Sequence, residues 1–231
     1  MTETTTVPIE RRSPRKRRAS AASEGASPET LRAQGLRTRN AIVRVARRLL
    51  LEGGPLEFSL RAVALRAGVS VSNLQYYFPT RPAVLRAVME PEINAYLDAL
   101  KRALNSGVSP REAHDAILMK AINDARDTKF VALWRHFFSF ASTDPECANL
   151  LDEWYDTLTQ ELARVIRAIN PKYGADESMQ VAALLIAMAD GLALQLGTKR
   201  RKHGYLQGLD QRYLAFANDV VLGKVPGPSK S

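Results

Sequence analysis

The chain contains a single cysteine, Cys147, among 231 residues. One cysteine cannot form an intramolecular disulfide, and it excludes a zinc site built on several thiolates. We therefore expect no disulfide and no structural metal. A reducing, cytoplasmic location is the simplest account of this composition.

Recognisable catalytic motifs are also missing. The three histidines, His114, His136 and His203, are isolated in sequence, and there is no HExxH, no G-x-S-x-G and no phosphate-binding glycine loop. Cys147 lies at a predicted helix start, where a helix dipole would lower its pKa, but no paired base accompanies it. We therefore expect no enzymatic activity and no cofactor.

Long apolar runs are absent as well. The longest, residues 181–196, is shorter than the ~20 residues that a membrane span needs and contains Asp190. We interpret it as a buried helix. The basic cluster RRSPRKRR at 11–18 is not followed by an apolar stretch, so it does not indicate a signal peptide, and we expect no membrane partner.

Positive charge is distributed unevenly. Residues 1–90 hold 16 Lys and Arg against 7 Asp and Glu, whereas the rest of the chain holds 17 of each. Basic charge concentrated in one region is typical of a protein that binds a polyanion such as nucleic acid.

Residues 59–81 read as two short helices joined by a glycine turn. Ser59 and Ser70 stand where N-caps belong, and Gly68 stands where a left-handed residue is needed. The second helix, through about Tyr76, turns Leu74 inward and leaves small and amide side chains outside. Such a face suits the major groove, so the segment predicts a DNA-binding helix-turn-helix.

The run AGVSVSNLQYYFPTR, with TRNAIVRVARRLLLEGG upstream, resembles the DNA-binding domain of TetR-type (TetR/AcrR) transcriptional regulators. The resemblance covers roughly residues 36–85, and the chain departs from the family pattern at Gln75 and Tyr77 and at the prolines Pro79 and Pro82. We expect these departures to affect which operator is read. The family's motif positions are filled in order by Ala67, Gly68, Val69, Ser70, Leu74, Tyr76, Tyr77, Phe78 and Arg81.

The resemblance implies an all-α fold, with a three-helix helix-turn-helix head and a larger C-terminal helical domain for ligand binding and dimerisation. We divide the chain into a disordered basic arm (1–34), the head (35–81), the helical domain (82–222) and a flexible tail (223–231). Two interpretations of the arm stay open: it contacts DNA backbone or minor groove, or it is a solvated charged tail.

Helical patterns extend along the rest of the chain, with no alternating strand pattern. The first helix runs from about Leu36 to Leu51 and is stopped by residues 53–55. Pro91 lies inside the fourth helix, where it predicts either a hinge or a kink that merely fits the packing. Ser109 caps the next helix, and a later helix ends at Asn170.

The site residues divide into two groups. For DNA, we expect Ser72, Asn73 and Gln75 at base edges and, by resemblance, Ser59, Tyr76, Tyr77 and Arg81 at phosphates; the remaining candidates are Ser70, Val71, Arg15, Arg17 and Arg18. For an effector, we expect a cavity lined by Trp134, Arg135, Phe138, Trp154 and Tyr155. Arg135, His136 and Asp190 would orient the ligand, with structural roles as the alternative.

These observations predict a sequence-specific transcriptional regulator, a ligand-responsive repressor that binds an inverted-repeat operator on double-stranded DNA. By resemblance it is a homodimer through its last two helices, about 176–197 and 205–222. Two alternatives are a nonspecific or architectural DNA-binding protein driven by the basic arm, and a module that binds an acidic protein.

Overall fold

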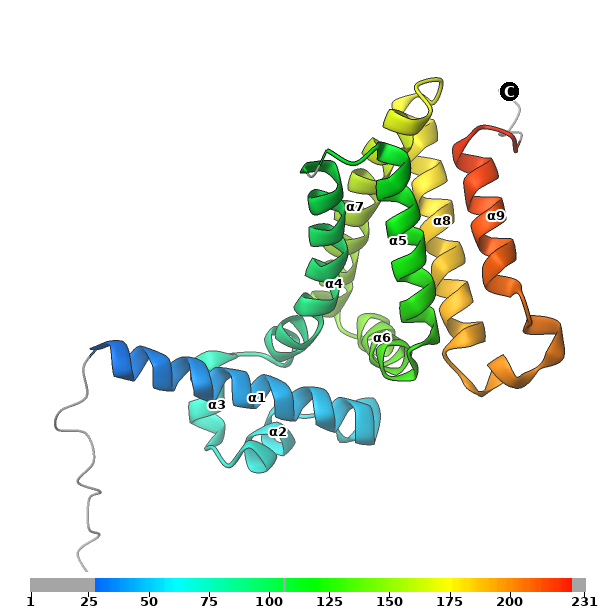
Figure 1. Cartoon of the computed structure of the whole chain (residues 1–231). Coiled ribbons are helices and arrows are strands. Elements are labelled where there is room, and N and C mark those ends of the chain that lie inside the picture. The colour runs from blue at the N-terminus through cyan, green and yellow to red at the C-terminus, as the bar shows by residue number, and fades with distance from the viewer. Residues whose placement is uncertain (1–27, 106, 226–231) are drawn as a thin grey trace, which may run out of the picture. The chain divides into compact units, whose positions relative to one another are not determined.

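The computed structural model describes residues 28–105 and 107–225. The chain forms two compact units, Met1–Arg37 and Thr38–Ser231. The described part of the first unit is helical, and the second unit contains the rest of the helices (Figure 1). The described residues contain no strand, so the all-α prediction is confirmed.

The helices follow one another with short connections. The first four are α1 (Pro28–Glu57), α2 (Leu60–Ala67), α3 (Val71–Tyr77) and α4 (Arg81–Asn105). They are followed by α5 (Pro110–Arg126), α6 (Thr128–Ala141), α7 (Pro145–Ile169), α8 (Ala175–Leu196), the 3-10 turns η1 (Lys199–Lys202) and η2 (Gly204–Leu206), and α9 (Leu209–Val221).

Helix α1 differs from the prediction at its N-terminus. It begins at Pro28 instead of about Leu36, so residues 28–34, which we assigned to the disordered arm, are helical. A proline suits the first turn of a helix, because its missing N–H would have no partner there. At the other end, Gly54 breaks the helical geometry with φ 62° and ψ −163°, close to the predicted stop.

The helix-turn-helix is held by the predicted caps. The Ser59 side chain accepts a hydrogen bond from the Ala62 amide at 3.1 Å, and the Ser70 side chain accepts one from the Asn73 amide at 3.1 Å. Gly68 adopts a left-handed conformation with φ 68°, which a residue with a side chain rarely adopts. These local contacts fix where α3 begins.

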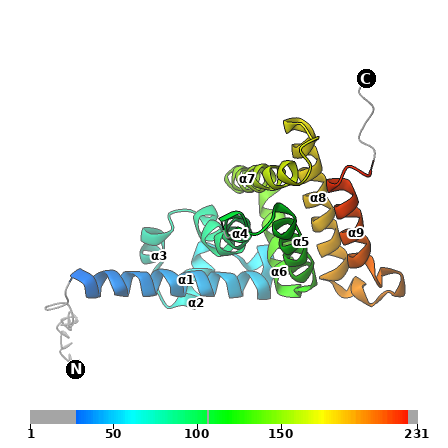
Figure 2. The same ribbon diagram turned by 45° about the horizontal axis from the view of Figure 1, so that its top comes forward.

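The larger domain is a bundle of α4 to α9. Helix α8 packs against α5, α7 and α9, and α8 and α9 lie side by side at one edge (Figures 1 and 2). Helix α5 begins with a capping box between Ser109 and Glu112, and Asn170 follows the end of α7, both as predicted. Helix α4 is continuous through Pro91. Its first turns point in a different direction from its later turns (Figure 1).

One hydrophobic core joins the helix-turn-helix head to the base of the bundle. It includes Phe58 and Leu74 from the head and Phe137, Phe140 and Trp154 from α6 and α7. The rings of Phe58 and Phe140 meet edge to face at 5.7 Å. Head and bundle therefore share buried apolar surface within the second unit, so a change at the base of the bundle reaches the head through packed side chains.

Candidate nucleic-acid interface and effector cavity

Helix α3 presents a small polar face to solvent. Leu74 is fully buried, whereas Ser72, Asn73 and Gln75 are exposed and Val71 is 39% exposed. The hydroxyl groups of Ser70 and Ser72 lie 3.0 Å apart, so Ser72 is oriented by the capping residue. This face can offer hydroxyl and amide groups to the edges of bases.

Two tyrosines end the same helix with different exposures. Tyr76 is 82% exposed, while Tyr77 is half-buried and meets the Tyr76 ring edge to face at 5.1 Å. Behind them, Phe78 is buried, and the Arg39 guanidinium lies 5.1 Å from the centre of its ring. Tyr76 is thus free to reach an outside partner, whereas Tyr77 also packs against the core.

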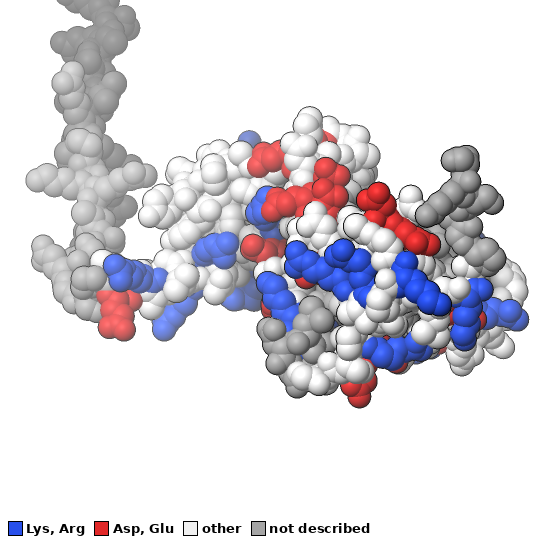
Figure 3. Space-filling view, turned by 90° about the horizontal axis from the view of Figure 1, so that it is seen from above, with Lys and Arg blue, Asp and Glu red and all other residues white. Residues whose placement is uncertain are grey.

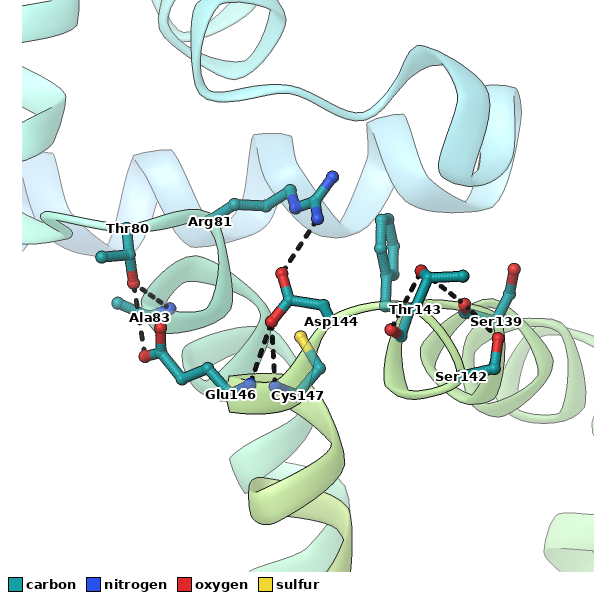
Figure 4. Close-up of polar contacts among 10 residues, drawn as sticks. Thr80, Arg81, Ala83, Ser139, Ser142, Thr143, Asp144, Glu146 and Cys147 are labelled. Carbon is teal, nitrogen blue, oxygen red and sulfur yellow. Dashed lines mark hydrogen bonds and ion pairs between the residues drawn. The ribbon is translucent and has the colours of Figure 1, made fainter.

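Arg81 has a partner inside the protein. Its guanidinium donates to the Asp144 carboxylate at 3.0 Å (Figure 4) and lies 5.1 Å from the centre of the Phe140 ring. Asp144 also caps α7 by accepting from the amides of Glu146 and Cys147 at 3.1 and 3.2 Å. The hydrogen bond from Arg81 is the main reason why the pKa of Asp144 is lowered. Sequence reasoning missed this contact, because 63 residues separate its partners.

Cys147 differs from the expectation. Burial raises the pKa of its thiol to about 11, although the thiol lies at a helix start. Within residues 28–105 and 107–225, no group of three or more His, Cys, Asp or Glu side chains could hold a metal ion. The three arm residues predicted to contact DNA, Arg15, Arg17 and Arg18, lie outside the described residues.

The bundle contains a cavity of about 190 Å³ that is partly open to solvent. All five side chains predicted for an effector site line it, and so does Asp190. His136 does not line it and lies instead against Gly54, where an added Cβ would stand 3.2 Å from the imidazole. Sequence reasoning missed three further lining aromatics: Phe130 near the start of α6, Tyr96 on α4 and Tyr213 on α9.

Asp190 is the main polar group of this cavity. The Tyr155 hydroxyl donates to its carboxylate at 2.6 Å. Burial nevertheless raises the pKa of Asp190, and burial together with the Asp190 charge raises the pKa of Tyr213 to about 12. Among the described residues, no Lys, Arg or His forms an ion pair with Asp190. The carboxylate is therefore placed in a largely apolar space without a counter-charge from those residues, which is costly when it is ionised.

Trp134 lines the cavity and has a buried polar atom of its own. Its indole Nε1 is enclosed and has no hydrogen-bond partner in the described part of the chain. Its ring lies 6.5 Å from that of Trp154 and 5.8 Å from that of Phe138. The cavity thus combines aromatic faces with two charged side chains, Asp190 and Arg135.

Helix α8 is buried on one side only, which corrects the expectation of a buried helix. Among the described helices, it is the one long and apolar enough to cross a membrane. Leu185 and Leu192 are buried, whereas Leu184 and Leu194 are 45% and 48% exposed. The exposed side also carries the small residues Ala183, Ala187 and Gly191.

Comparisons with known proteins match both parts of the chain. The family model for bacterial regulatory proteins of the tetR family matches residues 42–88, and that for the C-terminal part of BetI-type transcriptional repressors matches residues 110–207. The HTH-type transcriptional regulator BetI of Rhizobium meliloti (strain 1021) is 28% identical over 162 residues, which cover 70% of this chain and 78% of that protein.

Solved structures share the fold. A transcriptional regulator from Rhodococcus sp. Rha1 is 25% identical, with a TM-score of 0.59 over 81% of this chain and 95% of its own. A regulator from Saccharomonospora viridis, solved in complex with choline, is 20% identical, with a TM-score of 0.62 over 79% of this chain and 96% of its own.

Proposed function

Since the chain belongs to the TetR family of transcriptional regulators, we propose that it is a ligand-responsive repressor. It binds an inverted-repeat operator as a dimer and releases the operator when a small molecule occupies the cavity of the bundle. The observation that carries the proposal is the presence of an exposed polar face on α3 and a largely apolar cavity in the same unit.

Asn73 and Gln75 are the side chains that we assign to base edges, with Ser72 beside them. Amide side chains can pair with adenine in the major groove, and each good contact discriminates by about 1–3 kcal/mol. Tyr76 is the candidate phosphate contact with the greatest exposure. Arg81 is a weaker candidate for a phosphate contact, because its charge is already paired with Asp144.

The dimer uses the exposed side of α8 together with α9. Leu184 and Leu194 on α8 and Phe216 on α9 expose apolar surface, and the small residues between them allow a second pair of helices to approach closely. A second copy of this chain is the partner that the family resemblance favours. It would place two heads about 34–36 Å apart, as an inverted repeat requires.

The cavity is connected to the head through packed aromatic rings. Trp154 lines the cavity, and its ring lies 5.3 Å from that of Phe137. Phe137 belongs to the core that contains Phe140 and Phe58. An effector that repositions Trp154 would shift this core, and a differential affinity of a few kcal/mol is enough to change the population of the DNA-binding state.

The cavity favours an organic cation as effector. Aromatic faces attract cations, and an ammonium group beside Asp190 would pair with a carboxylate that forms no ion pair with the described residues, although the Arg135 side chain also lines the cavity. Choline carries such a group and is the probe that we choose.

Two measurements test the proposal. Selection from a random duplex pool at about 150 mM salt should enrich an inverted repeat, and an unenriched pool would favour the nonspecific alternative. Calorimetry should then compare choline with its neutral isostere, in which a tert-butyl group replaces the trimethylammonium group. We expect choline to bind at least about tenfold more tightly. Equal affinities for choline and its neutral isostere would contradict a cationic effector, and they would not affect the result of the operator selection.

A further inference from the structure

The connection between α8 and α9 carries a run of exposed basic side chains. Lys199, Arg200, Arg201 and Lys202 are consecutive and exposed, and they form the 3-10 turn η1. No acidic residue lies between Asp190 and Asp210 in the sequence. Within the described residues, none of the four forms an ion pair. We name residues 199–202 the basic turn.

The basic turn is built on a fixed base. Gly197 precedes it and packs so closely that an added Cβ would stand 2.3 Å from the Val131 side chain and 2.8 Å from the Ala125 carbonyl oxygen. Leu206 follows it and is buried. Arg126, at the end of α5, pairs with Asp210, at the start of α9. Both ends of the connection are therefore held against the bundle.

Neutral groups orient one of the four charges. The Arg200 side chain donates to the Gln195 side chain at 2.8 Å and to the Tyr205 hydroxyl at 3.3 Å. Tyr205 is 69% exposed and stacks on His203 with the ring centres 5.1 Å apart. Exposed aromatic rings beside unpaired guanidinium and ammonium groups are typical of surfaces that bind nucleic acid.

The basic turn lies at the end of the bundle that joins the head. Gly197, which precedes it, packs on the junction of α5 and α6, and α6 contacts the head through Phe140 and Phe58. Both ribbon views place the α8–α9 connection at this end (Figures 1 and 2). At the opposite end, the face in Figure 3 carries acidic and basic side chains together. The basic turn is thus at the head end of the bundle.

We propose that the basic turn, Lys199–Lys202, is a second DNA-contacting element, which binds backbone phosphates of the same duplex that α3 reads. This rests on the proposed function, because α3 must first bring DNA to this side of the protein. Phosphate contacts add affinity and fix orientation, and they carry no sequence information. The bundle therefore contributes directly to DNA affinity as well as to effector binding.

The test compares two variants that each lose one Lys and one Arg. Arg201→Gln with Lys202→Gln neutralises half of the basic turn, and Lys101→Gln with Arg102→Gln removes the same charges near the far end of α4, where both are exposed. Affinity for the selected operator is measured over a range of salt concentrations. We expect the first variant to flatten the slope of log K against log salt by about two, because each protomer of the dimer loses one phosphate contact. Its sequence preference should stay unchanged. The control variant should leave the slope unchanged.

Equal salt slopes for the two variants would overturn the proposal. If both slopes match that of the unaltered protein, the basic turn makes no phosphate contact; if both slopes are reduced by the same amount, the effect comes from long-range charge and not from a contact. A photo-crosslinker placed by Lys202→Cys gives a second readout, because Cys147 is buried and its thiol is largely protonated. It should crosslink to the operator, whereas one placed by Arg102→Cys should not, and the reverse outcome also contradicts the contact. If the unaltered protein enriches no sequence, the proposed function fails; an enriched operator with an unchanged slope rejects the basic turn alone.

Discussion

The head and the bundle keep their polar groups in opposite places. In the head, Ser59 and Ser70 cap helices, and Asn73 and Gln75 face outward. In the bundle, Asp190 lines a largely apolar cavity, and the Trp134 indole N–H is buried. A partner of the head meets polar groups on an open surface, whereas a ligand of the bundle has to enter and satisfy groups that the described residues leave without a full set of partners.

The largest effect should come from removing the packing that joins the two regions. Phe137 is fully buried, and its ring lies 6.2 Å from that of Trp134 and 5.3 Å from that of Trp154. Phe137→Ala should lower the free energy of unfolding by about 3–5 kcal/mol. Denaturant titration followed by circular dichroism measures this, and Leu56→Ala, at a fully exposed position, is the control with a change within about 0.5 kcal/mol. Two separate transitions in the unaltered protein would show that the head folds independently.

The second largest effect should come from replacing Asp190, the carboxylate that lines the cavity of the bundle. Asp190→Asn should cost about 2–5 kcal/mol of choline affinity, because a buried charge loses its partner, while operator affinity without ligand stays the same. In the unaltered protein, choline affinity should rise as the pH rises through the raised pKa of Asp190, and the variant should show no such rise. Calorimetry across pH measures both. A pH-dependent rise that persists in Asp190→Asn would assign the titration to another group.

The stability of the ligand-free protein should depend on the ionisation of Asp190 in the opposite direction: choline affinity rises with pH, whereas the free energy of unfolding falls. The pKa of Asp190 is higher in the folded state than in the unfolded state. The stabilisation that protonated Asp190 gives to the fold is therefore fully present at pH values below the unfolded-state pKa, and it is lost as the pH rises through the folded-state pKa. Asp190→Asn should therefore be at least as stable as the unaltered protein at neutral pH. Thermal unfolding monitored by calorimetry checks this, and a lower melting temperature would indicate that the carboxylate stabilises the fold.

The third effect concerns Gln75 on the exposed polar face of α3. Gln75→Ala should change the preferred base at one position of each half-site, with a loss of about 1–3 kcal/mol of discrimination. Choline affinity should stay the same, because Gln75 does not line the cavity. Repeated duplex selection measures the preference. An equal loss on every sequence would contradict a base-reading role.

The smallest effect concerns the ion pair between the two regions. Arg81 and Asp144 are 40% and 19% exposed, so the pair is worth at most about 1 kcal/mol. Arg81→Ala should weaken binding to all DNA and flatten the salt slope by about one if Arg81 also reaches a phosphate. Asp144→Asn keeps the α7 cap and frees Arg81, so it should leave that slope unchanged or steepen it. Unchanged slopes in both variants would give Arg81 a purely internal role.

The head could be predicted from sequence because its determinants are local. Ser59, Gly68 and Ser70 each act within a few residues of their own position, so the motif contains the information needed to place α3. The start of α1 was missed although Pro28 and Glu29 are typical of a first helical turn. The basic, serine-rich composition of the preceding residues favours disorder and competes with that local signal.

The cavity could be predicted only in part. Trp134 and Phe138 on α6, and Trp154 and Tyr155 on α7, cluster in sequence and indicate an aromatic lining. Tyr96 and Tyr213 come from α4 and α9, and only tertiary packing brings them to the same space. The Arg81–Asp144 pair was missed for the same reason.

The chain has two tryptophans, Trp134 and Trp154, and both line the cavity. All of its intrinsic tryptophan fluorescence therefore originates at the proposed effector site. The emission maximum reports the polarity of that space, and quenching or a shift on addition of a compound reports its arrival. Tryptophan fluorescence can therefore report ligand binding without an added label, and collections of compounds can be screened before the operator is known.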